Sequence, residues 1–283
     1  MGSALSLMLG RDAVLRLLVG SLLFASGCRS DPVVPALAPS VADPSASPLI
    51  AGDATSRPLL GQLSRHFWAR GGMPRFTVAD QPLSVSGALA AIQDGVLTAT
   101  LLALPAGAEA PPAARPIARS RVLLAAGPGT AIRHLEVDTL IRLIRATGPV
   151  IVDGEALQLR VPETTDAAWE ALAASHDGVS AALTFARQRP GATSVSDAET
   201  ARDLLRRTAG SLTVLDLGTA QLHGSPYWPV TIEGLTRQPY LTIYLALAGG
   251  QAGARPSPLD AFAAFAVSES ASVVALDLGY EAP

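Results

Sequence analysis

Hydrophobic and polar positions follow two periods along this chain, one typical of short strands and one of amphipathic helices. The apolar stretch at residues 48–52 predicts a strand, and the spacing of Leu60, Leu63 and Phe67 predicts a helix after it. The next three predicted elements are a strand at 75–78, a helix at 84–95 and a strand at 97–104. This β-α-β-α-β order predicts an α/β fold with a mainly parallel sheet.

The same periods continue to the end of the chain. Extended segments are predicted at 116–126, 157–161, 212–217, 241–247 and 272–278. Helices are predicted at 137–144, 169–174, 179–186, 197–207 and 259–267. The Pro, Ala and Gly residues of 106–114 predict a loop between the third strand and the segments that follow.

The most apolar segment of the chain lies near its start, at residues 13–27. It is shorter than the roughly 20 residues of a membrane-spanning helix, follows Arg11 and contains Arg16, and ends in small residues, as a signal peptide does. The small residues stand directly before Cys28, a pattern that resembles a bacterial lipobox. We therefore expect residues 1–27 to be a lipoprotein signal peptide and Cys28 to be lipidated. The alternative is that Cys28 is a chance cysteine in the signal sequence. Met8 is a second candidate for the initiating methionine.

A proline-rich segment follows the cysteine. Residues 28–48 contain five prolines separated mainly by small residues, which predicts an extended tether rather than a packed element. A lipid anchor requires such a spacer to hold a folded domain away from a membrane surface. We therefore expect the folded part to begin at Leu49 and the protein to be exported to the cell envelope.

The composition excludes several classes of function. Among the 283 residues there is no lysine, because all 21 basic residues are arginine, and there is one cysteine. A Schiff-base lysine enzyme, a P-loop NTPase, an intramolecular disulfide and a cysteine-ligated zinc site are therefore excluded. The net charge of −3 argues against a nucleic-acid partner, and no cofactor is implied.

Six segments of the folded part carry a family resemblance, at 52–59, 84–95, 115–144, 210–214, 237–247 and 262–280. In this order they resemble the phosphate-binding (PstS-type) receptors of bacterial ABC importers. The resemblance implies a two-lobed periplasmic binding protein of type II with a two-strand hinge. Lobe one would comprise 49–121 and 245–283 and lobe two 122–244, with crossover segments near 116–126 and 239–248.

The resemblance also implies a ligand and a partner. We expect a phosphate-like small anion between the lobes, an ABC permease as the membrane partner, and a monomer. The expected ligand-binding residues are Thr55, Ser56, Ser84, Ser86, Gly87, Thr98, Arg160 and Thr165. The underlying chemistry is that helix starts offer free N–H groups and a favourable dipole to an anion, and an arginine can add a bidentate contact. The alternative for each Ser and Thr is a helix cap, and residues 53–56 have the composition of a capped turn.

The sequence departs from this family's pattern at three places. Ala54 replaces a usual glycine, Thr98 stands at the position of an aspartate that receives the phosphate proton, and the spacing from Arg160 to Thr165 is one residue short. Glu163 falls where a serine is usual, so it either points to solvent or repels a phosphate. The alternative function is therefore a degenerate binding-protein-like lipoprotein with a sensing role or an envelope scaffold role.

Catalysis is the third class of function, and the sequence does not favour it. There is no G-x-S-x-G elbow and no H-E-x-x-H motif. The four histidines, His66, His134, His176 and His223, are scattered along the chain and are typical of surface or capping positions.

Overall fold

The computed structural model describes residues 47–163, 166–188, 195, 198–222, 227–249 and 257–283, which belong to one compact unit spanning residues 44–283. The predicted signal peptide and Cys28 lie outside the described residues, as does most of the predicted tether. Within the described part, no helix is both long enough and apolar enough to cross a membrane.

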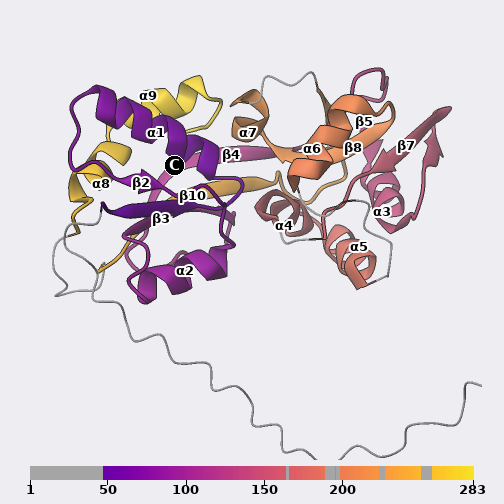
Figure 1. The fold of residues 1–283 in the computed structure, drawn as a ribbon. Helices are drawn as coiled ribbons and strands as arrows, with labels where there is room; N and C mark the ends of the chain where they lie inside the picture. Colours follow the sequence, from indigo (N-terminus) through magenta and orange to yellow (C-terminus); the bar gives the residue numbers. More distant parts are fainter. Residues whose placement is uncertain (1–46, 164–165, 189–194, 196–197, 223–226, 250–256) are drawn as a thin grey trace, which may run out of the picture. The chain divides into compact units, whose positions relative to one another are not determined.

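The α/β architecture predicted from the sequence is confirmed (Figure 1). The strands in the described residues are β1 Leu49–Gly52, β2 Thr77–Val78, β3 Ala99–Pro105, β4 Arg115–Ala126, β5 His134–Glu136, β6 Val150–Val152, β7 Glu155–Leu159, β8 Ser211–Asp216, β9 Trp228–Glu233 and β10 Tyr240–Leu247. Hydrogen-bonded neighbours follow the order β2-β1-β3-β10-β4-β8-β7-β6, and β9 pairs with both β4 and β5.

The helices lie between and after these strands (Figure 1). They are α1 Arg57–Ala69, α2 Val85–Gln93, α3 Val137–Arg145, α4 Ala167–Ala173, α5 Asp177–Gln188, α6 Ala198–Arg207, α7 Leu217–Leu222, α8 Asp260–Ala266 and α9 Glu269–Asp277.

The first part of the chain folds as the predicted β-α-β-α-β unit. β1 lies between β2 and β3 and is parallel to both. Pro58 stands in the first turn of α1, where its missing N–H is tolerated. After α2 the chain turns at Gly95, whose φ of +71° favours glycine, and the next residues lead into β3. The turn chemistry and the hydrophobic spacing therefore specify this unit together.

β3 carries helices on both of its faces (Figure 1). Leu101 and Ala103 belong to the main core together with Leu59 of α1. Leu102, between them, belongs to a separate cluster with Ala88 of α2. Because successive side chains of a strand point to opposite faces, a strand buried on both sides appears in the sequence as an unbroken apolar run.

Two antiparallel strands, β4 and β10, occupy the centre of the strand order. Residues 115–121 of β4 pair with β10, and residues 122–126 pair with β8. β4 therefore passes from one part of the sheet to the other between Arg121 and Val122. The predicted crossover segments at 116–126 and 239–248 coincide with these two strands, while the predicted lobe boundaries remain a prediction.

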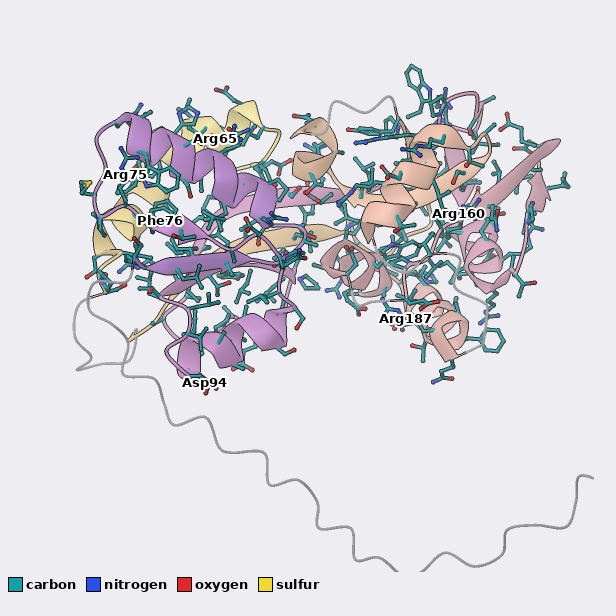
Figure 2. The ribbon with its side chains drawn as sticks, in the orientation of Figure 1. Arg65, Arg75, Phe76, Asp94, Arg160 and Arg187 are labelled. Carbon is teal, nitrogen blue, oxygen red and sulfur yellow. The ribbon has the colours of Figure 1, made fainter. Side chains whose placement is uncertain are left out.

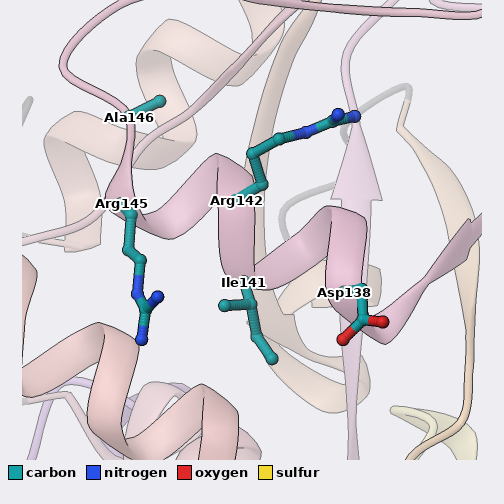
Figure 3. Close-up of a pocket in the computed structure, with 5 residues that line it drawn as sticks. All are labelled: Asp138, Ile141, Arg142, Arg145 and Ala146. Carbon is teal, nitrogen blue, oxygen red and sulfur yellow. The ribbon is translucent and has the colours of Figure 1, made fainter.

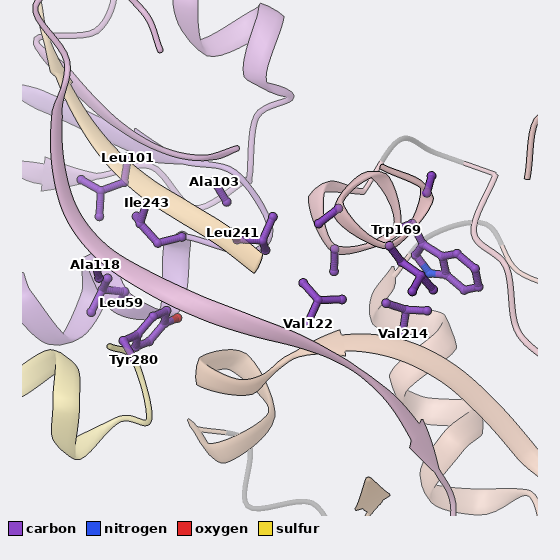
Figure 4. Close-up of a cluster of buried hydrophobic side chains, with 14 of the residues drawn as sticks. Leu59, Leu101, Ala103, Ala118, Val122, Trp169, Val214, Leu241, Ile243 and Tyr280 are labelled. Carbon is purple, nitrogen blue, oxygen red and sulfur yellow. The ribbon is translucent and has the colours of Figure 1, made fainter. Parts of the chain in front are cut away.

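The core consists mainly of aliphatic side chains (Figure 4). Several of the few aromatic residues gather at one place, where the ring centroids of Phe67 and Phe262 lie 5.5 Å apart and those of Phe76 and Phe262 lie 4.9 Å apart. Full burial of a phenylalanine stabilises a fold by about 1.5–3 kcal/mol. This aromatic cluster joins α1, the segment before β2, and α8.

The strand predicted at 272–278 is wrong, because this segment is part of α9. Ser268 caps the helix by accepting from Ala271 N, and Ala271, Val274 and Ala275 are buried at helical spacing. Val273 and Leu276 are exposed, so the apolar run at 272–278 is not a continuously buried strand, although its composition suggests one. The β-branched valines favour a strand locally, and packing of α9 against α1 overrides that preference.

The sequence did not predict several short elements, because each has too few residues to show a repeat of apolar positions. β5, β6, β9 and α7 were not predicted, and the strand predicted at 212–217 ends at Asp216, where α7 begins. The three residues of β5 or of β6 cannot establish an alternation, and the six residues of α7 are less than two helical turns, so contacts with neighbouring elements decide such segments.

Candidate functional site

The turn between β1 and α1 holds a buried carboxylate, that of Asp53. Its Oδ1 accepts hydrogen bonds from the N–H groups of Thr55 (2.8 Å) and Ser56 (2.9 Å), and its Oδ2 accepts from the N–H of Ala103 in β3 (2.5 Å). The Asp53 residue is 7% exposed. We call these three converging N–H groups the α1 cradle. The turn continues directly into α1, because Arg57 N–H donates to the Asp53 carbonyl.

The environment of Asp53 has opposing effects on its acidity. Burial raises the pKa of Asp53 from 3.8 to about 6, and the bonds from Ala103, Ser56 and Thr55 lower it in part. Burial is the larger effect. A proton on this carboxyl is therefore held more tightly in the folded chain than in water.

Thr55 and Ser56, two of the predicted site residues, lie in this turn and are both buried. The Ser56 hydroxyl donates to the Leu101 carbonyl at 2.8 Å, so it is engaged inside the fold. Their N–H groups bond to the Asp53 carboxylate of the same chain, and their predicted role in binding a ligand stays a prediction.

The start of α2 lies at the same edge of the sheet. Leu83 N–H donates to the carbonyl of Gly52, the last residue of β1. Ser84 caps α2 by accepting from Gly87 N at 3.1 Å, and its hydroxyl lies 3.3 Å from that of Ser86. All three residues are exposed, so this helix start is open to water.

Thr98 does not join these residues. Its N–H donates to the carbonyl of Leu49, at the beginning of β1, and it precedes β3. The α1 cradle lies at the other end of β1, next to Ala103. Because a strand advances about 3.3 Å per residue, Thr98 and Ala103 are roughly 15 Å apart along β3.

Arg160, labelled in Figure 2, follows β7, and it forms hydrogen bonds with residues of β8. Its Nε donates to the Ser211 hydroxyl at 3.3 Å, and its carbonyl accepts from the Thr213 hydroxyl. Partial burial lowers the pKa of Arg160 below its usual value. Glu163 is exposed, which is the first of the two alternatives for this side chain. Thr165 lies outside the described residues.

A second buried aspartate, Asp216, ends β8 and precedes α7. Its Oδ1 accepts from Thr219 N at 3.0 Å and from the Ser120 hydroxyl of β4 at 3.0 Å. Burial raises the pKa of Asp216, while these bonds and the nearby charge of Arg202 lower it. Gly218 N also donates to the Ser120 hydroxyl, so β4 and the start of α7 are fixed to each other.

A third aspartate, Asp166, caps α4. It accepts from the N–H groups of Ala168 (2.9 Å) and Trp169 (3.3 Å). Desolvation raises the pKa of Asp166, and the neighbouring Asp216 charge raises it further. No group of three or more His, Cys, Asp or Glu residues suited to a metal ion occurs in the described part of the chain.

α7 connects the second buried aspartate to the turn that holds the first. The Thr219 hydroxyl donates to the carbonyl of Thr55 at 3.3 Å. Tyr280, from the end of the chain, is 1% exposed and packs so closely on Gly218 that a Cβ there would collide with the ring. A glycine is therefore required at this position.

The Tyr280 hydroxyl is buried near Thr219, whose N–H bonds to Asp216. Among the described residues it has no hydrogen-bond partner of good geometry, although it lies beside Thr219. Burial raises the pKa of Tyr280 well above 10, and the Asp216 and Asp53 charges add to the effect. Figure 4 shows this ring beside β4.

The predictions from sequence missed Asp53, Asp216 and Tyr280 as site residues. A signal for the first two was present: Asp53 follows a predicted strand and Asp216 stands near the end of one, and aspartate is a preferred residue directly before a helix. No local pattern marks Tyr280, because only the fold brings the end of the chain to α7.

A shallow surface pocket lies elsewhere, on α3 (Figure 3). Its lining residues are Asp138, Ile141, Arg142, Arg145 and Ala146. The polar side chains come from the outer face of one amphipathic helix, with no contribution from a second element. The pocket therefore belongs to a solvated helix face and not to the buried polar groups described above.

Comparison with known proteins identifies the fold. The sequence matches no protein-family model and none of the curated proteins. Similar solved structures include an ABC-type phosphate transport receptor from Vibrio cholerae (TM-score 0.57, 13% identity, covering 83% of this chain and 99% of that one). A protein from Clostridium perfringens, described as a phosphate ABC transporter substrate-binding protein with bound phosphate, is also similar (TM-score 0.62, 10% identity, covering 84% and 99%).

The same fold also occurs in a different class of protein. The reduced form of OxyR from N. meningitidis is similar over 79% of this chain and 94% of that one, with a TM-score of 0.53 and 15% identity. At these identities the likeness establishes a type II periplasmic binding protein fold and leaves the ligand open.

Proposed function

We propose that this chain is an exported receptor of the cell envelope, anchored through a lipid on Cys28, that binds a small solute between two lobes. A phosphate-like anion is the ligand that the sequence predicted, and an ABC permease is the proposed partner of the monomeric receptor. The fold supports this role, because similar structures include phosphate receptors. The N-terminal sequence pattern supports the anchor.

The observation that carries the proposal is the group of buried polar residues near α1 and α7. Asp53, Asp216, Thr219 and Tyr280 come from segments far apart in the chain and are buried together with little contact to solvent. Titratable groups whose pKa values are shifted by burial gather at functional sites, which makes this group the candidate recognition site. Two helix starts, those of α1 and α2, lie at the same edge.

The test is thermal unfolding of the purified full chain with a panel of solutes. Phosphate, sulfate, molybdate and organic anions test the predicted ligand class, and amines and zwitterions test the acidic character of the buried group. We expect one member to raise the melting temperature, because a solute that binds only the folded state must stabilise it. An unchanged melting temperature with every solute at millimolar concentration would contradict the receptor proposal.

The anchor has a separate test. Replacing Cys28 by serine removes the only thiol in the chain. We expect the variant to move from the membrane fraction to the soluble fraction, since a lipid chain supplies the affinity for the bilayer. Membrane association that survives the change would contradict lipidation at this residue.

The second candidate is a sensing or scaffold lipoprotein that does not transport a solute. Two contacts favour it: the α1 cradle already contains a carboxylate, and the Thr219 hydroxyl bonds to Thr55. Genes for an importer permease and ATPase beside this one would favour transport. The panel above separates a scaffold from a receptor, because a scaffold role predicts no response to any solute, whereas a sensing role is separated from transport by the neighbouring genes.

A further inference from the structure

We propose that α7 and the C-terminal residues Tyr280 and Glu281 form a clamp between the two predicted lobes, and that this clamp must release before the lobes can move relative to each other. The inference rests on the two-lobed receptor of the proposed function and names what restrains its movement. It does not depend on which solute binds, because every contact of the clamp lies within the chain.

The first step is the position of α7 across the predicted lobe boundary. α7 continues directly from β8, which pairs with residues 122–126 of β4 and lies in predicted lobe two. α7 also packs against α1 and β4, and the Thr219 hydroxyl donates to the Thr55 carbonyl of predicted lobe one at 3.3 Å. The chain therefore joins α7 to one lobe, and its contacts join it to the other.

The second step is the attachment of α7 to β4 directly before that strand changes partners. The Ser120 hydroxyl of β4 accepts from Gly218 N at 3.1 Å and donates to Asp216 Oδ1 at 3.0 Å. These three residues are buried, so breaking the bonds would leave polar groups without a partner. The change of partner follows between Arg121 and Val122. The crossing point of β4 is therefore fixed to the start of α7.

The third step is the surface that the end of the chain provides for α7. Arg119 of β4 and Glu281 exchange two backbone hydrogen bonds, at 2.9 and 2.8 Å, which hold the end of the chain on β4. The Tyr280 ring, which Figure 4 shows beside β4, is buried against Gly218 and leaves no room for a Cβ there. Close packing of this ring on Gly218 therefore seats α7 on predicted lobe one.

The fourth step is the link to the candidate recognition site. Asp53, Asp216 and Tyr280 are buried, so a solute cannot reach them in this arrangement of the lobes. Hinge movement between two lobes requires the contacts across their boundary to break or slide. Rotation of predicted lobe two about the crossing strands β4 and β10 would carry α7 away from Thr55 and Tyr280. Release of the clamp is therefore the step that opens the site.

The proposal is tested with Gly218→Ala, which places one methyl group against the Tyr280 ring. Spin labels on cysteines introduced at the exposed Gln93 and Arg142, one in each predicted lobe, report the distance between the lobes in a Cys28→Ser background. We expect double electron–electron resonance to give one narrow distance distribution for the parent chain, and a broader distribution with a second population for Gly218→Ala. An unchanged distribution would overturn the clamp.

The matched control for the added methyl group is Gly61→Ala. Gly61 lies in α1, and a Cβ there would meet no atom within 4 Å, so the distribution should stay that of the parent chain. Tyr280→Ala removes the ring that the methyl group at position 218 meets, and we expect Gly218→Ala to add no further change to that variant. Equal broadening by Gly61→Ala, or full additivity of the other two changes, would overturn the proposal.

Thr219→Val covers the case in which Gly218→Ala does not fold. It keeps the size of the side chain and the N–H that bonds to Asp216, and it removes the bond to Thr55. We expect a smaller broadening of the same distribution. Thr184→Val is the control, because it loses a hydroxyl bond within α5 alone and should not broaden the distribution. No broadening by Thr219→Val, or equal broadening by the control, would overturn the proposal.

The distance measurement separates this proposal from the proposed function. It uses no solute, so the solute panel can fail while the clamp is confirmed. A distribution that none of the clamp variants changes would overturn the clamp and leave the receptor proposal to its own test.

Discussion

The starts of α1 and α2 lie at the same edge of β1, and their chemistry differs. At α1 the N–H groups of Thr55 and Ser56 are buried and face the Asp53 carboxylate. At α2 the N–H of Gly87 is capped by the Ser84 hydroxyl in an exposed position. In sequence, both appear as small polar residues before an apolar helix.

The difference between the two starts teaches that a capping pattern does not determine the strength of a cap. α1 packs against α7, α8 and α9, and the N–H groups of Thr55 and Ser56 are buried, so they need an acceptor within the protein. α2 covers one face of β3 and leaves its first turn in solvent, where water can satisfy free N–H groups. The same local chemistry therefore has a large energetic effect at one start and a small effect at the other.

The largest expected effect comes from Asp53→Ala. Three buried N–H groups would lose their acceptor, at about 1–3 kcal/mol each, while relief from burying a charge offsets part of this loss. We expect the free energy of unfolding to fall by about 2–4 kcal/mol, measured by urea denaturation at pH 7. If Asp53→Ala lowered the free energy of unfolding by less than Ser84→Ala does, the contrast between the two helix starts would be wrong.

The next effect is the dependence of stability on pH. The folded pKa of Asp53 is about 6 and lies above the ordinary value of 3.8, so the folded state binds the proton more tightly. The stabilisation is full below pH 3.8 and is lost as the pH rises through 6. Acidification from pH 7 to pH 5 should therefore increase the free energy of unfolding by about 1 kcal/mol from this group.

Asp53→Asn provides the control for the pH effect. It keeps the size of the side chain and removes its titration, so the slope of stability against pH should decrease. Asp166 and Asp216 contribute with the same sign, because their pKa values are also raised, and their part of the slope remains. Stability that falls on acidification in this range would contradict the assignment of a raised pKa to Asp53.

The smallest expected effect is that of Ser84→Ala. The variant loses one exposed cap bond, to Gly87, and caps of this kind contribute about 0.5–1 kcal/mol. Ser86→Ala, two residues on, serves as the control, because its hydroxyl caps no N–H group and the change should alter stability by less than about 0.5 kcal/mol. Equal effects of the two variants in urea denaturation would exclude a capping role for Ser84.

The sequence predicted the two helix starts of the site. It did not predict which groups their N–H bonds engage or which distant residues lie beside them. Thr55, Ser56 and Ser84 lie where helix-start chemistry placed them, at the end of β1. Thr98 was assigned by its place in a family pattern, and the parallel register of β1 and β3 puts it at the other end of the strand. Tyr280 could not be found, because it lies far from α7 in the sequence and is joined to it by packing alone.

The sequence by itself determined the α/β class, the order of the first five elements and the two long segments that became β4 and β10, because hydrophobic period and turn residues act locally. Only the tertiary structure decided that 269–277 is a helix, that β4 changes partners after Arg121, and that Asp53 fills the α1 cradle. These features depend on burial and on contacts between distant segments. Burial gives the capping aspartate Asp53 a raised pKa and three N–H partners, one of them from a distant strand.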